Sequence, residues 1–141
     1  MDVAVDILFW IHLLSLGLAG VATFGIPFVG SKLPGAPAES RPVLFKIMHQ
    51  MSTVGRAALV LLLITGPLIF WLRYGWVAPN AWFWVKMVLI LLLIAIMVGA
   101  GLNARRTEQG DTAAARRAPQ IGTAAIITFA LVILAAVLAF D

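Results

Sequence analysis

The sequence predicts an all-α, polytopic membrane protein, in which four transmembrane helices form a bundle and both termini face the periplasm. The first observation is the composition: 62% of the 141 residues are hydrophobic and 11% are charged, and the mean hydropathy is +1.04. These values lie far outside the range of soluble domains. The second observation is that the apolar residues form four long runs, at residues 3–30, 43–72, 81–102 and 121–140.

Each run is long enough to cross a bilayer. An α-helix rises about 1.5 Å per residue, so ~20 residues span a hydrocarbon core of ~30 Å. The runs occupy most of the chain, which predicts one integral-membrane domain over residues 1–141 without a soluble module. The first run opens with the acidic residues Asp2 and Asp6. Because a cleaved signal peptide opens with basic residues, we expect this run to remain as a span.

The third observation is an uneven distribution of basic residues, which predicts the orientation. The second loop carries Arg73 alone, whereas the first and third loops with their flanks are strongly basic. The positive-inside rule therefore places the first and third loops in the cytoplasm of a bacterial inner membrane. These loops favour contact with anionic lipid, and nucleic acid is not expected as a partner. The basic residues of these two loops are Lys32, Arg41, Lys46, Arg105, Arg106, Arg116 and Arg117.

Local signals predict how the helices begin, end and pack. Ser40, just before Pro42, is placed to cap the second helix. Residues 111–117 are predicted to form a short surface helix that ends at Pro119. Small residues are expected where helices touch, because they let backbones approach closely in lipid. The candidates are Ser15, Gly17, Ala19, Gly20 and Thr23 in the first run, Gly99, Ala100 and Gly101 in the third, and Ala124, Ala125, Ala130, Ala135 and Ala136 in the fourth.

Four ionisable residues within the runs are the candidate functional residues: His12, His49, Arg56 and Lys86. Such groups cost several kcal/mol at membrane depth and are retained mainly where they bind, conduct or catalyse. His12 shares a helix face with Ser15. Lys86 follows the aromatic cluster that marks the outer interface, which places it at a depth similar to that of His12. The cluster consists of Trp76, Trp82, Phe83 and Trp84.

His12 and His49 are expected to lie about 20 Å apart along the membrane normal. Two axial ligands of one haem bring their nitrogens within about 4 Å of each other, because each metal–nitrogen bond is ~2 Å long. One haem therefore cannot be bound by both histidines. His12 is the better haem ligand, and His49 is expected to be a separate metal site or an interface residue.

Arg56 lies on one stripe of the second helix with His49, Ser52 and Thr53. A guanidinium within the bilayer needs acceptors, and no acidic residue lies at this depth in any run. The possible partners are backbone carbonyls, Thr53, Gln120, a lipid phosphate or an anionic ligand such as a porphyrin propionate. The last of these would make Arg56 a cofactor-binding residue.

Simpler interpretations remain for each residue. His12 could be a histidine that only forms a hydrogen bond to a neighbouring helix, and Lys86 could extend to the outer interface or pair with Asp6. Arg56 could reach the cytoplasmic headgroups. His49 with Met48 and Met51 could form a copper site with soft sulfur ligands, or His49 could have no functional role. The absence of cysteine excludes covalently attached c-type haem.

Several motifs resemble the HemJ-type protoporphyrinogen oxidases and, more loosely, the CopD-type copper-resistance membrane proteins. Trp10-Ile11-His12, with Phe24 and Pro27 downstream, is similar to the first segment of the HemJ-type family. The motif from Trp82 to Lys86 is similar to its third segment, and Arg117-Ala118-Pro119 resembles the approach to the fourth. The resemblance implies that His12 ligates b-type haem and that Lys86 is a functional, catalytic residue.

The leading expectation is therefore a haem b-associated redox protein of the membrane that resembles the HemJ-type family. The first alternative is a CopD-like copper transport or resistance protein that uses His49, Met48 and Met51. The second is a membrane subunit or assembly factor without enzymatic activity. A porphyrin, a redox partner and a second copy of the chain are left open as partners beside the bilayer.

Overall fold

The computed structural model describes residues 2–140, and four α-helices make up most of this part of the chain. In order they are α1 (Val3–Gly30), α2 (Arg41–Tyr74), α3 (Ala81–Glu108) and α4 (Thr112–Phe140). All four are long and apolar enough to cross a membrane. Residues 2–140 contain no β-strand. The predictions of an all-α fold and of four membrane-spanning helices are confirmed.

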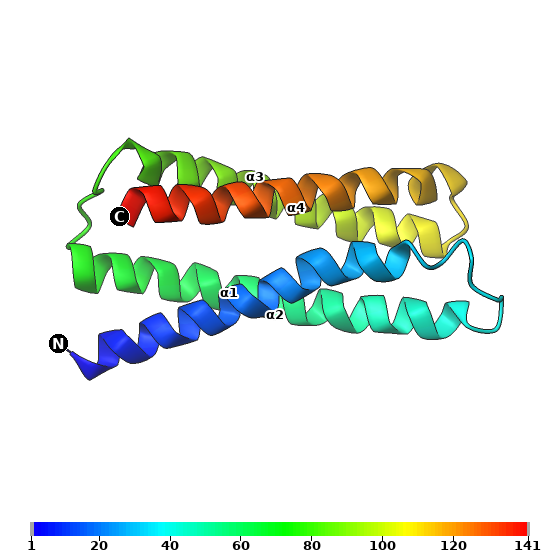
Figure 1. The fold of residues 1–141 in the computed structure, drawn as a ribbon, viewed down its shortest axis with the longest axis horizontal. Helices are drawn as coiled ribbons and strands as arrows, with labels where there is room; N and C mark the ends of the chain where they lie inside the picture. Colours follow the sequence, from blue (N-terminus) through cyan, green and yellow to red (C-terminus); the bar gives the residue numbers. More distant parts are fainter. Residues whose placement is uncertain (1, 141) are drawn as a thin grey trace. The chain divides into compact units, whose positions relative to one another are not determined.

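The chain divides into two compact units, one over residues 1–78 and the other over residues 79–141. Each unit is a hairpin of two antiparallel helices: α1 packs on α2 in the first, and α3 packs on α4 in the second (Figure 1). The connections within the hairpins are short, covering residues 31–40 and 109–111. Each hairpin thus crosses the membrane twice and returns its chain to the side where it began.

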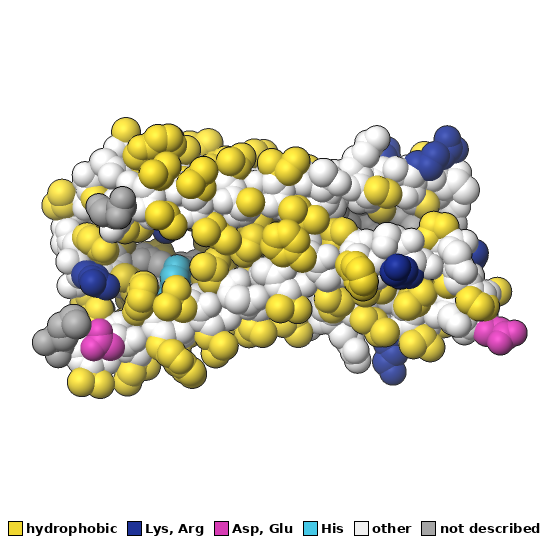
Figure 2. Space-filling model, in the orientation of Figure 1, with side chains coloured by type: hydrophobic (Ala, Val, Ile, Leu, Met, Phe, Trp, Pro, Cys, Tyr) yellow, Lys and Arg dark blue, Asp and Glu magenta, His cyan; other side chains and the backbone are white. Residues whose placement is uncertain are grey.

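Hydrophobic side chains are spread over the face of the protein that Figure 2 shows, and many large ones are exposed. On α3, for example, Val88 is 66% exposed and Leu91 is 67% exposed. A water-soluble protein rarely exposes so large a continuous apolar surface. The exposed surface therefore agrees with a lipid environment, in which these side chains replace contacts with water by contacts with acyl chains.

Small residues bring α1 and α2 into close contact. A Cβ atom added to Gly55 would lie 2.8 Å from the Cβ atom of Ala22, so only glycine fits there without a shift of the backbones. Towards the first loop, the side chain of Met51 occupies the space beside Gly25. The buried residues of this contact are Ser15, Ala19 and Ala22 of α1 and Gly55, Ala58, Thr65 and Ile69 of α2. The predicted role of Ser15 and Ala19 in helix packing is therefore confirmed. The same prediction is wrong for Gly17, Gly99 and Gly101, where an added Cβ would meet no atom within 4 Å.

The prediction of a separate surface helix at residues 111–117 is wrong. α3 continues to Glu108, and α4 begins at Thr112 and contains Pro119 within it. The Oδ1 atom of Asp111 accepts hydrogen bonds from the backbone N–H groups of Ala113 at 3.0 Å and Ala114 at 3.2 Å. This cap stabilises the first turn of α4, so the helix forms despite the backbone donor that proline lacks.

The start of α2 differs in detail from the expectation. Ser40 occupies the N-cap position, but its side chain makes no capping hydrogen bond. Its backbone oxygen instead accepts a hydrogen bond from the N–H of Leu44 at 3.1 Å. At the other end, Gly75 adopts a left-handed conformation with φ 57°, which glycine tolerates better than other residues.

Candidate functional site

His12 forms a side-chain hydrogen bond between α1 and α2. Its Nδ1 atom lies 2.8 Å from Oγ1 of Thr65, and Thr65 is buried with a relative exposure of 3%. The hydroxyl of Thr65 also donates to the backbone oxygen of Leu61 at 2.7 Å. The three groups form a chain from the imidazole to a carbonyl one turn earlier in α2.

The two hydrogen bonds of Thr65 are linked through its single hydroxyl proton. When Thr65 donates that proton to Leu61, its oxygen accepts from His12, and Nδ1 of the imidazole carries the hydrogen. A histidine that binds a metal through one nitrogen commonly donates from the other to a neighbouring group, which orients the ring.

Gly66 lies beside the same imidazole ring. A Cβ atom added to Gly66 would lie 3.6 Å from Cε1 of His12, which is an ordinary van der Waals contact. Thr65 thus forms a hydrogen bond with one nitrogen of the ring, and the backbone of Gly66 lies beside Cε1.

His49 is remote from this site. It is exposed near the start of α2, whereas Thr65 is sixteen residues further along the same helix, about 24 Å at 1.5 Å per residue. The terminal methyl group of Met48 lies 3.4 Å from a Cβ atom added to Gly30 of α1, and Met51 lies against Gly25. These methionines thus pack on glycines of α1. No group of three or more His, Cys, Asp or Glu residues within residues 2–140 could hold a metal ion.

Arg56 is exposed on α2, next to the buried Gly55. Its Nη2 atom donates to Oγ1 of Thr53 at 3.4 Å, and Thr53 in turn donates to the backbone oxygen of His49 at 3.1 Å. Thr53 was among the acceptors expected for this guanidinium. The bond to Thr53 engages one nitrogen of the guanidinium, which has five N–H donors and can contact an anion through the others.

Lys86 belongs to the second hairpin and is half-buried there. Its ammonium nitrogen lies 5.1 Å from the centroid of the Phe140 ring, which is within the range of a cation–π contact. Phe83 packs against the same ring, edge to face, with centroids 6.3 Å apart. The lysine is thereby held near the last turn of α4, where the unpaired carbonyl groups of a helix favour a positive charge.

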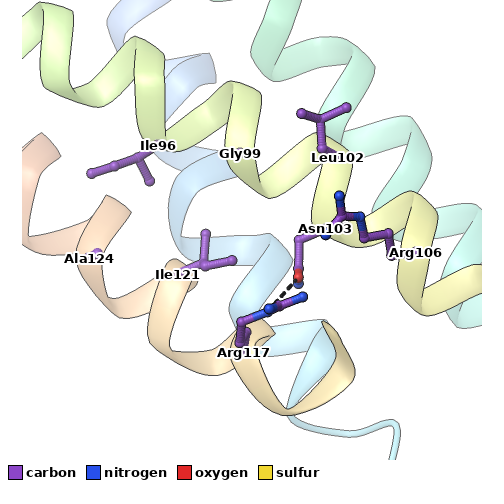
Figure 3. Close-up of a pocket in the computed structure, with 8 residues that line it drawn as sticks. All are labelled: Ile96, Gly99, Leu102, Asn103, Arg106, Arg117, Ile121 and Ala124. Atoms are coloured by element: carbon purple, nitrogen blue, oxygen red, sulfur yellow. Dashed lines mark hydrogen bonds between the residues drawn. The ribbon is translucent and has the colours of Figure 1, made fainter. Parts of the chain in front are cut away.

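A polar cluster on the second hairpin was missed by the sequence analysis. Asn103 is buried with a relative exposure of 7%, and its Nδ2 atom donates to the backbone oxygen of Ala114 at 2.8 Å. Its Oδ1 atom accepts from Nε of Arg117 at 3.4 Å, as Figure 3 shows. Arg106 lies beside them on α3, and the three residues line an open groove. The signal that could have revealed the cluster is an asparagine near the end of an apolar helix, since such a side chain needs partners on a neighbouring helix.

Comparisons of the chain with protein-family models, with curated proteins and with solved structures yield no match. The resemblance to the HemJ-type and CopD-type families therefore depends on the motif residues named above, and the function has to be argued from the geometry of the chain itself.

Proposed function

We propose that this protein is a haem b-associated redox protein of the bacterial inner membrane, in which His12 would hold the haem iron. The observation that supports this proposal most directly is the hydrogen-bond chain from His12 through Thr65 to Leu61. It orients an imidazole within a pair of apolar helices, as a neighbouring group commonly orients a histidine that binds a metal. Haem proteins commonly hold iron by one such histidine.

The residues around His12 fit a planar, apolar cofactor. Thr65 orients the ring, and Gly66, which has no side chain, lies beside it. The neighbouring side chains on the outer surfaces of α1 and α2 are apolar, which suits a porphyrin that partitions from water into the bilayer. When bound, haem b would supply a one-electron redox centre, and the apolar surroundings would tune its potential by excluding water.

Fixed positive charges have separate roles in this proposal. Residues 56 and 65 are about 14 Å apart along α2, so Arg56 lies towards the cytoplasmic side of His12. Its guanidinium would hold an anionic group such as a propionate. Lys86, held over Phe140 on the second hairpin, would act as a charged catalytic group.

The orientation with both termini in the periplasm forms part of the proposal. It is supported by the four membrane-spanning helices and by the basic residues of the first and third loops. Because the chain has no cysteine, a single cysteine placed at Ala78 or Gly110 can be labelled without interference. The proposal expects Ala78 to be labelled from outside and Gly110 to be protected, and labelling of Gly110 from outside would contradict it.

A visible spectrum of the purified protein tests the cofactor. We expect a Soret band in the wild type, loss of this band in His12→Ala, and retention of most of it in His49→Ala. Added imidazole should restore part of the band in His12→Ala, because a free imidazole can replace the missing ligand. Circular dichroism of each variant should show unchanged helix content.

Three results would contradict the haem proposal. They are a wild-type protein without a Soret band after growth with a haem precursor, equal loss of the band in both histidine variants, and full retention in His12→Ala. A protein that instead retained stoichiometric copper, lost in His49→Ala, would support the CopD-like alternative. A protein with neither cofactor would support a role as a membrane subunit without enzymatic activity.

A further inference from the structure

The groove on the second hairpin has one charged end and one apolar end. It has a volume of about 370 Å³ and is lined only by residues of α3 and α4. Arg106 and Arg117 lie at one end with Asn103, whereas Ile96 and Ala124 lie at the other (Figure 3). The remaining lining residues are Gly99, Leu102 and Ile121.

The charged end is arranged to contact an anion. The Nε atom of Arg117 is engaged by Oδ1 of Asn103, and Asn103 is itself held by the backbone oxygen of Ala114. The guanidinium is thus oriented through one edge, and its terminal nitrogens can donate to a ligand. None of the described residues that line the groove is acidic. Two guanidinium groups without a carboxylate between them favour a phosphate or a carboxylate ligand.

The apolar end of the groove is open because Gly99 of α3 has no side chain to fill it. A Cβ atom added to Gly99 would meet no atom within 4 Å. Residues 96 and 106 are about 15 Å apart along the axis of α3, so the groove runs from the basic end of the helix well into its apolar part. A ligand that fills it must carry a negative charge at one end and a hydrocarbon chain at the other.

We propose that this groove binds an anionic phospholipid, with its phosphate between Arg106 and Arg117 and the upper part of one acyl chain beside Gly99. The two ends of the groove match the two parts of such a molecule, and the helices that line it are apolar enough to cross a membrane. The volume accommodates the phosphate and the start of a chain, while the rest of the lipid stays in the membrane. Asn103 acts as a positioning residue that orients Arg117.

The test measures lipid binding to the full chain in a neutral detergent by native mass spectrometry. The probes are dioleoylphosphatidylglycerol and, for comparison, the uncharged dioleoylphosphatidylcholine. We expect one tightly retained phosphatidylglycerol and at least about fivefold weaker retention of phosphatidylcholine. The variant Arg106→Gln/Arg117→Gln should lose about tenfold or more in affinity for phosphatidylglycerol, since one basic residue near anionic lipid contributes about fivefold.

The chain offers matched controls for both ends of the groove. Arg105→Gln/Arg116→Gln removes the same number of charges from the adjacent positions, which do not line the groove, and should change the affinity by less than about threefold. At the apolar end, Gly99→Leu should displace the acyl chain and weaken binding. Gly101→Leu is the control, because Gly101 is equally open but lies outside the groove.

Each control also defines a contradictory result. Equal loss in the two double-arginine variants would show that only the net charge matters, and equal effects of Gly99→Leu and Gly101→Leu would exclude an acyl chain in the groove. Full displacement of the lipid by glycerol phosphate at a matched concentration would show a site for a free phosphate rather than a lipid. Thermal melts of all variants, monitored by circular dichroism, distinguish loss of the site from loss of the fold.

Discussion

The two hairpins are joined in different ways. α1 and α2 meet along small residues in the middle of their length, and a polar bond from His12 to Thr65 lies within that contact. α3 and α4 are joined by asparagine side chains at both ends. Asn103 donates to the backbone oxygen of Ala114, and Asn80 donates to the backbone oxygens of Leu138 at 3.1 Å and Ala139 at 3.3 Å.

The difference shows that glycine serves two purposes in this protein. Gly55 is required because the two helices of the first hairpin approach too closely for a side chain. Gly99 and Gly101 meet no atom within 4 Å of an added Cβ, so glycine leaves open space there. A run of small residues in a membrane helix therefore indicates either a contact or a groove, and the sequence alone does not distinguish the two.

The largest expected effect tests the close contact of the first hairpin. Gly55→Ala should lower the free energy of unfolding by about 1–3 kcal/mol, because overpacking costs that amount and outweighs the ~0.5–1 kcal/mol gained in helix preference. Gly99→Ala, in the open position of the second hairpin, should be neutral or slightly stabilising. Unfolding of both variants in mixed detergent micelles, followed by circular dichroism, measures the difference. If the two substitutions had the same effect, the distinction between contact and groove would be wrong.

A smaller effect is expected at the ends of the second hairpin. Asn103→Ala removes two hydrogen bonds at a buried position and should lower the free energy of unfolding by about 1–2 kcal/mol. A hydrogen bond between membrane helices contributes ~0.6 kcal/mol on average, and its loss costs more where burial leaves a group without a partner. Asn80→Ala removes bonds at an exposed position, where water can replace them, and should cost less than half as much. The same unfolding measurement ranks the two, and the reverse order would contradict this description of the hairpin.

The smallest effect concerns the polar bond of the first hairpin. Thr65→Val keeps the shape of the side chain but removes the acceptor for His12, and should cost about 0.6–1 kcal/mol in protein purified without cofactor. Thr53→Val is the matched control on the same helix. It removes bonds of an exposed threonine to Arg56 and His49 and should change the stability by less than ~0.5 kcal/mol. A nitrogen-15 NMR spectrum of the histidines should show loss of the single Nδ1–H tautomer of His12 in Thr65→Val only.

Membrane spans and candidate residues on helix faces were predictable because they depend on local properties. The runs of apolar residues predict the four helices, because a span of the bilayer requires about 20 consecutive apolar residues, independently of which residues they contact in the folded protein. Helical periodicity placed His12 on the same face as Ser15 and Ala19, which the structure confirms as a buried face. The separation of His49 from His12 likewise follows from the rise of a continuous helix.

The tertiary structure alone decided which partners the polar groups have. Nothing in the sequence selects Thr65 as the acceptor for His12, because the choice depends on the register between two helices that only their packed small residues define. The first turn of α4, which precedes Pro119 in the same helix, is held by a local cap from Asp111 and by one contact across the hairpin, from Asn103 to the backbone oxygen of Ala114. The bond from Arg117 to Asn103 also lies at the groove that Arg106 lines, so residues that the sequence counts only as loop charges form the charged end of one groove.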